Sequence, residues 1–189
     1  MSFIQVFTEA ECAEIAARPG ERHQFDGEAD DEYVTRCKNI VRDFLVTKGI
    51  ELNMPKASWK VRVNIKSHEK TKEWHHDDVT LLNFVINVRG EGTSVLMDDG
   101  TIGVLPLGYG CILVGDQGYT MLGLHPTLHR GPPHDNDRAI MHVMLIPNFK
   151  ITHWISGESV CDEHTNVEMY KERQSRLDTL LDTELARVA

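Results

Sequence analysis

The sequence lacks several features that define whole classes of proteins. Among its 189 residues, no apolar run approaches the roughly 20 residues that a membrane-spanning helix needs. Residues 1–6 have neither the basic region nor the long apolar stretch of a signal peptide. The 20 basic residues are outnumbered by 29 acidic residues, which disfavours binding to the phosphates of nucleic acids. We therefore expect a cytoplasmic protein that binds neither a membrane nor nucleic acid.

Cysteine is also scarce. The four cysteines, Cys12, Cys37, Cys111 and Cys161, are widely scattered and form no Cys-x-x-Cys pair. Two disulfides are arithmetically possible, but this spacing favours four reduced thiols in a reducing compartment. The length suits one domain with a sizeable core, so we interpret residues 1–189 as a single domain.

Helical patterns lie at the two ends of the chain. Within a predicted helical flank at 1–55, residues 8–11 form a capping box, and the helix that they open should end near residues 18–20. A second helix is predicted from about Asp30 to Lys48. A third, at 160–189, carries a rough leucine stripe, which predicts either packing on the outside of the domain or a homodimer contact.

Between these helices, residues 56–150 have the pattern of short strands. Trp59, Val61, Val63 and Ile65 alternate with polar residues, which predicts a strand with one buried face. Residues 79–88 are almost continuously apolar, as in a strand covered on both faces. Closely spaced strands without intervening helical patterns favour a sandwich or barrel. The expected fold is therefore mainly β with flanking helices.

The segment around His75 has the spacing of a metal site. His75 and Asp77 are two residues apart, so at the start of a strand both side chains point to the same face. The pair His76 and Asp78 has the same spacing and is a rival. Because Trp74 precedes His75 and the apolar run follows directly, we prefer the first pair over the rival and over a solvated turn.

A third ligand has to come from another strand. His129 lies about fifty residues downstream, with apolar residues before it and a turn after it. The alternatives are His125, the stronger competitor, and then His134 and His142. Arg138 favours His129, because its planar guanidinium could bind a carboxylate beside a metal held by two histidines and one carboxylate.

These residues resemble a known family. Residues 57–149 look like the double-stranded β-helix, a jelly-roll or cupin-like barrel, of the Fe(II)/2-oxoglutarate-dependent dioxygenases, in a prolyl-hydroxylase-like form. The resemblance rests on His75-x-Asp77, then residues 110–114 leading to His129, then Arg138. It implies that His75, Asp77 and His129 ligate Fe(II), that Arg138 binds the far carboxylate of 2-oxoglutarate, and that O2 is the oxidant.

Further polar residues are candidates for the same cavity. Asn83 and Asn87 share the face of His75 and Asp77 if no bulge intervenes, and buried polar groups need partners. We expect Asn83 and Asn64 to contact the cosubstrate, and Arg62 and Asn87 to contact the substrate. The alternatives are structural hydrogen bonds for Asn83 and solvent exposure for Arg62 and Asn64. Residues 161–164 look like a ligand cluster only superficially, and we interpret them as a loop and a helix start.

The expected function is hydroxylation of a small molecule or a protein side chain, with release of succinate and CO2. Three alternatives stay open: a cupin-like metalloenzyme that needs no 2-oxoglutarate, an AlkB-like nucleic-acid demethylase, and a barrel that only binds a ligand. In this chain, Asn64 followed by residues 74–78 is similar to the pattern of the AlkB-type enzymes. They carry a second distal arginine, whereas here no arginine follows Arg138 before Arg173.

Overall fold

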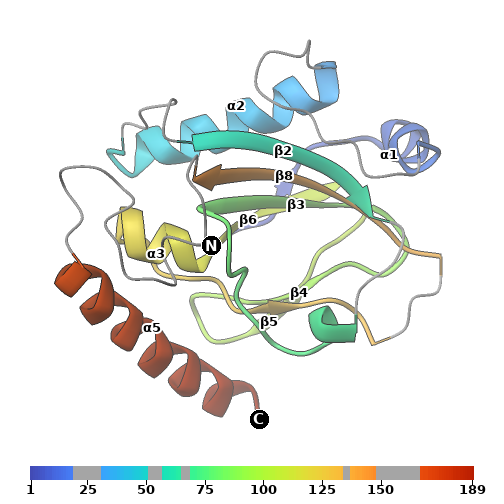
Figure 1. Ribbon diagram of the computed structural model, residues 1–189. Helices are drawn as coiled ribbons and strands as arrows, with labels where there is room; N and C mark the ends of the chain where they lie inside the picture. The colour runs from blue at the N-terminus through green and yellow to red at the C-terminus, as the bar shows by residue number, and fades with distance from the viewer. Residues whose placement is uncertain (19–30, 51–56, 65–68, 134–136, 148–166) are drawn as a thin grey trace.

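The computed structural model describes residues 1–18, 31–50, 57–64, 69–133, 137–147 and 167–189. Two antiparallel sheets form its centre (Figure 1). The strands of the larger sheet, in spatial order, are β1 (Ile4–Gln5), β6 (Tyr109–Val114), β3 (Leu82–Arg89), β8 (Ala139–Pro147) and β2 (Ala57–Asn64). The smaller sheet contains β5 (Ile102–Val104), β4 (Ser94–Leu96) and β7 (His129–Arg130). Within the described residues, strand pairing does not join the two sheets into a closed barrel.

Both faces of the larger sheet are covered, as the apolar run at 79–88 predicts. Along β3, Phe84 and Ile86 point toward the helices, whereas Val85 packs with residues of the smaller sheet. The helix side holds most of the buried side chains, and Figure 1 shows α2 (Glu32–Thr47) lying across this face. The inner side has a smaller apolar cluster and leaves room for polar groups. The site therefore lies between the two sheets.

The predicted N-terminal helices are present. In α1 (Glu9–Ala16) the capping box is confirmed, because the Thr8 side chain accepts from the Glu11 backbone N–H and the Glu11 carboxylate accepts from that of Thr8. The helix ends at Ala16, slightly before the predicted end at residues 18–20. Helix α2 starts after its N-cap Asp31, whose side chain accepts from the Val34 N–H.

The C-terminal helix α5 (Val167–Val188) packs against α3 (Asp116–Leu122), beside the two sheets (Figure 1). Its side chains at Leu177 and Glu184 are buried. The predicted start of this helix near residue 160 lies outside the described residues. Among the helices of the described ranges, including the 22-residue α5, none combines the length and the apolar character needed to cross a bilayer.

Several short elements were not predicted: β1, β5, β7, α3 and the 3-10 helix η2 (Glu69–Lys72). Most contain two to four residues, which is too few for a hydrophobic period to be recognised. The geometric reason given for the pair His75 and Asp77 was wrong. The strand that follows them begins only at Leu82, and Asp77 lies outside any regular element. Predictions for Ile65, His134 and residues 161–164 lie outside the described residues.

Candidate metal centre

A cavity of about 190 Å³ opens between the two sheets. Seven of the eight predicted site residues line it: Arg62, Asn64, His75, Asp77, Asn83, His129 and Arg138. The eighth, Asn87, does not. Its amide donates to the backbone oxygens of Gly90 and Leu105 at 3.0 and 3.1 Å, so it holds a loop. Asn87 lies on the same face of β3 as Asn83, but the cavity does not extend that far along the strand.

His75, Asp77 and His129 converge at this cavity. Each offers one ligand atom, and the three atoms lie within 4.8 Å of one another. The backbones of His75 and His129 form an isolated antiparallel bridge, with N–H to O distances of 2.9 and 3.0 Å. This bridge brings the imidazole ring centroids to 4.4 Å from each other. Two residues far apart in the sequence are therefore held side by side by backbone pairing.

Backbone carbonyls orient both imidazoles. Nδ1 of His75 lies 2.7 Å from the carbonyl oxygen of Glu73, and Nδ1 of His129 lies 2.9 Å from that of Thr127. A carbonyl only accepts, so each Nδ1 carries the proton and donates. Each Nε2 is then left for the cavity side, which is the arrangement that metal-binding histidines use in proteins.

The charges of the three groups suit a cation. Burial alone would raise the pKa of Asp77, but the charge of His129 and hydrogen bonds from His129 and Asn83 hold it well below its usual range. Burial and the neighbouring His129 lower the pKa of His75, which keeps that ring neutral. Burial would also lower the pKa of His129, but the Asp77 carboxylate outweighs burial and raises it. The contact between them joins His129 Nε2 and Asp77 Oδ1, which lie 3.7 Å apart.

Two of the rival ligands, His76 and His125, are not among the residues that line this cavity. Nε2 of His76 lies 2.9 Å from Oε2 of Glu184 on α5, and its Nδ1 lies 3.6 Å from Oδ1 of Asp116 on α3. Nε2 of His125 lies 3.7 Å from the other oxygen of Glu184. His76 and His125 therefore contact the Glu184 carboxylate, whereas His75 and Asp77 line the cavity.

Arg138 directly precedes β8 and is buried, with 7% of its surface exposed. Its Nη2 donates to the Thr93 hydroxyl at 3.0 Å, and both residues line the cavity. Sequence analysis missed Thr93, because a lone threonine before a short strand carries no signal of its own. Arg62 reaches the cavity from β2, where it pairs with His142 of β8 in the sheet register.

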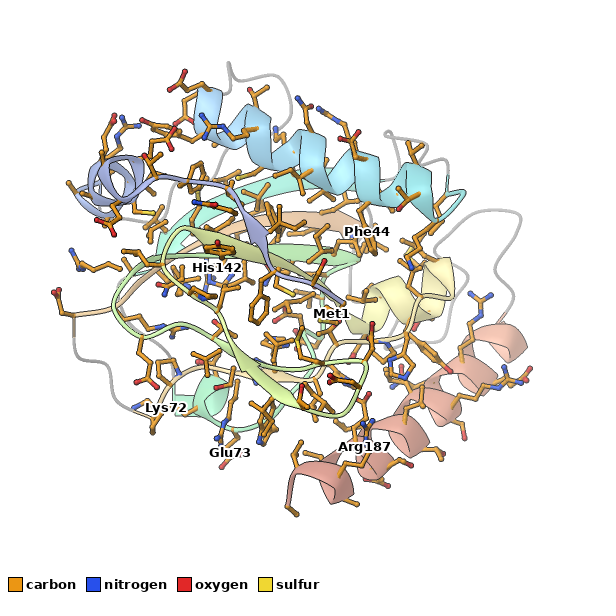
Figure 2. All side chains as sticks on the ribbon, turned by 180° about the vertical axis from the view of Figure 1, so that it is seen from behind. Met1, Phe44, Lys72, Glu73, His142 and Arg187 are labelled. Atoms are coloured by element: carbon orange, nitrogen blue, oxygen red, sulfur yellow. The ribbon has the colours of Figure 1, made fainter. Side chains whose placement is uncertain are left out.

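His142 is a further residue of the cavity, and its place in the sequence did not distinguish it from a core histidine. Figure 2 marks His142 among the side chains enclosed between the sheets. Burial lowers the pKa of His142 to about 3, and the positive charges of Arg62 and Arg138 act in the same direction. The Asp77 carboxylate opposes them but does not outweigh them. The ring is therefore neutral at physiological pH.

No protein-family model matches this chain, and no curated protein matches it. Solved structures do match. A prolyl-4-hydroxylase from Pseudomonas putida aligns with a TM-score of 0.54 and 12% identity, over 78% of this chain and 84% of that one. A viral collagen prolyl hydroxylase from Paramecium bursaria Chlorella virus-1, solved with 2-oxoglutarate, aligns with a TM-score of 0.51 and 12% identity, over 77% of this chain and 94% of that one. The chain therefore has the double-stranded β-helix fold of these prolyl hydroxylases.

Proposed function

We propose that this protein is a non-haem Fe(II)- and 2-oxoglutarate-dependent oxygenase. It would hydroxylate a C–H bond of a small molecule or an amino-acid side chain and release succinate and CO2. The observation that carries the proposal is the convergence of His75, Asp77 and His129 beside the buried Arg138 in one cavity. The likeness in fold to two prolyl hydroxylases, one of them solved with 2-oxoglutarate, supports it.

The ligand atoms fit Fe(II). Two imidazole nitrogens and one carboxylate oxygen occupy one face of an octahedral ion and leave the other positions open. The bound iron would supply the activation of dioxygen, coupled to oxidative decarboxylation of 2-oxoglutarate. The chain's own contribution is to hold the three ligands, to orient the bound molecules and to keep water away from them.

Arg138 is the proposed anchor of 2-oxoglutarate. A guanidinium binds a carboxylate through two parallel hydrogen bonds, and burial strengthens such a contact because water does not screen it. The Thr93 hydroxyl, which accepts from Nη2, would hold the guanidinium plane in place. Asn64 lines the same cavity and is a further candidate contact for the cosubstrate.

Arg62 is the proposed substrate-binding residue. It is half-buried in the cavity lining, on a strand that flanks the site. A second guanidinium in the cavity favours a substrate with an anionic group, such as the carboxylate of an amino acid. The net charge of −9 makes nucleic acid a poor substrate, because attraction to phosphates supplies much of that binding.

The test is an anaerobic titration of the metal-free protein with Fe(II) and then 2-oxoglutarate. The expected result is a visible charge-transfer band between the iron and the keto acid in the wild type, and no band in Asp77→Ala. If iron binds but no band forms, a cupin-like metalloenzyme without 2-oxoglutarate is the better assignment. If iron does not bind to the wild type, the proposal is wrong.

A further inference from the structure

A chain of polar side chains leads from the edge of the larger sheet to Asp77. Asn83 Nδ2 donates to Asp77 Oδ2 at 2.7 Å. His142 Nδ1 lies 3.4 Å from Asn83 Oδ1 and 3.3 Å from its Nδ2. Asn64 Nδ2 lies 3.5 Å from His142 Nε2. The three residues stand on β3, β8 and β2, which are neighbours in the sheet, so strand pairing sets their spacing.

The donors and acceptors in this chain follow one consistent direction. The Asp77 carboxylate only accepts, so the Asn83 amide must turn its NH2 group toward it. At the far end, the Asn64 NH2 group faces Nε2 of His142, which accepts in a neutral ring. The ring proton then sits on Nδ1 and donates to Asn83 Oδ1. The contact with His142 thus keeps the Asn83 amide from flipping.

The consequence is a difference between the two oxygens of Asp77. Oδ2 is held by Asn83, whereas Oδ1 is the oxygen that faces Nε2 of the predicted ligand His129. Burial favours this hydrogen bond. Asn83 is 3% exposed, and a buried amide without a partner would destabilise the fold.

We propose that Asn83, oriented by His142, is a positioning residue that fixes the Asp77 carboxylate so that a single oxygen, Oδ1, coordinates the metal. The inference rests on the metal site of the proposed function, but not on 2-oxoglutarate or on the reaction. Partners of metal ligands commonly influence affinity by about 10- to 100-fold, because they hold the ligand in its binding orientation.

The first test uses Asn83→Leu, which keeps the side-chain size and removes the amide. Metal-free protein is titrated with Co(II), whose visible spectrum reports coordination geometry. We expect about 10-fold weaker binding or more, and an altered spectrum, because Asp77 becomes free to bind through both oxygens. Met144→Leu is the matched control: Met144 pairs with Asn83 in the sheet and lines the same cavity, but offers no amide.

The second test asks whether His142 acts through Nδ1. His142→Asn places an amide nitrogen where Nδ1 stands, since both atoms are bonded to Cγ, whereas His142→Phe removes it. We expect the Phe variant to bind Co(II) more weakly and the Asn variant to recover most of the wild-type affinity and spectrum. This comparison also decides the question if circular dichroism shows that Asn83→Leu does not fold.

Each outcome has a distinct meaning. Wild-type affinity and spectrum in Asn83→Leu would overturn the inference, and so would equal behaviour of the two His142 variants. Unchanged Co(II) binding in Asp77→Ala would instead refute the metal site itself, and with it the proposed function. Loss of binding in Asp77→Ala together with intact binding in Asn83→Leu leaves the metal site standing and rejects only the role of Asn83.

Discussion

Oε2 of Glu184, near the end of the C-terminal helix, lies 2.9 Å from Nε2 of His76, the residue between His75 and Asp77. The side chains of His76 and Glu184 are 2% and 8% exposed, so the contact is shielded from water. The segment is also held by α3, because the Asp116 backbone N–H donates to the Asp77 carbonyl oxygen at 2.8 Å. Two helices that offer no ligand thus fix the backbone of the predicted metal site.

Replacing Glu184 by alanine should destabilise the fold. The change leaves Nε2 of the buried His76 without its partner, and an unsatisfied buried group costs about 1–3 kcal/mol. Urea unfolding followed by circular dichroism measures this loss. Glu184→Gln should retain most of the stability, because its amide oxygen can still accept. Glu172→Ala, at an exposed position of the same helix, is the control, and an equal loss in that variant would contradict the argument.

Binding of a divalent metal should stabilise the protein. A ligand that binds only the folded state adds about 2.7 kcal/mol at a concentration 100 times its Kd. We expect Zn(II), which is redox-inert, to raise the midpoint of thermal unfolding in the wild type but not in His129→Ala. His125→Ala should respond like the wild type, since His125 contacts Glu184 and not the cavity. The opposite pattern for the two variants would make His125 the third ligand.

The two arginines of the cavity should have separable effects on 2-oxoglutarate. Truncating one partner of a buried, hydrogen-bonded charge pair costs about 2–5 kcal/mol, so Arg138→Ala should weaken cosubstrate binding by about 30-fold or more. Arg62→Ala should leave this affinity near the wild-type value, because we assign Arg62 to the substrate. Titration of the charge-transfer band under anaerobic conditions measures both variants. If only Arg62→Ala loses much affinity for 2-oxoglutarate, then Arg62 is the cosubstrate anchor and Arg138 the substrate contact.

The supporting hydroxyl should have a smaller effect. Thr93→Val removes the acceptor for Arg138 Nη2 and keeps the shape of the side chain. The donor is a charged guanidinium, and a hydrogen bond to a charged group contributes about 1.5 kcal/mol or more, so we expect about a 10-fold loss of cosubstrate affinity with Fe(II) binding unchanged. Loss of iron as well would show that Thr93 supports the structure of the whole site.

The buried thiols should be unreactive in the native protein. Cys37 and Cys111 are fully buried, and burial raises the pKa of each to about 12. In a Cys161→Ser background, a thiol reagent at pH 8 should therefore label the protein only after unfolding in urea. Fast labelling of the native protein would contradict this.

The same pKa shifts predict a loss of stability in alkali. An unfolded cysteine has a pKa of about 9, so the unfolded state releases these protons first. The free energy of unfolding should therefore fall as pH rises from about 9 toward 12. Urea unfolding at a series of pH values measures the slope, which should be shallower in Cys37→Ala, Cys111→Ala.

Local patterns in the sequence determined the features that depend on neighbouring residues. The capping box at Thr8 and Glu11 acts within one helical turn, and the apolar run of β3 reports burial of both faces directly. The spacing of His75 and Asp77 likewise allowed both side chains to reach one ion. It did not exclude the adjacent pair His76 and Asp78, because that pair has the same spacing.

Only the tertiary structure decided which side faces the cavity. The bridge between His75 and His129 brings the third candidate ligand into place, and Glu184 holds His76 away from the cavity. Asn83 and Asn87 share one face of β3, yet only Asn83 reaches Asp77. These choices depend on strand pairing and helix packing between distant parts of the chain, and a period of two or 3.6 residues carries no information about them.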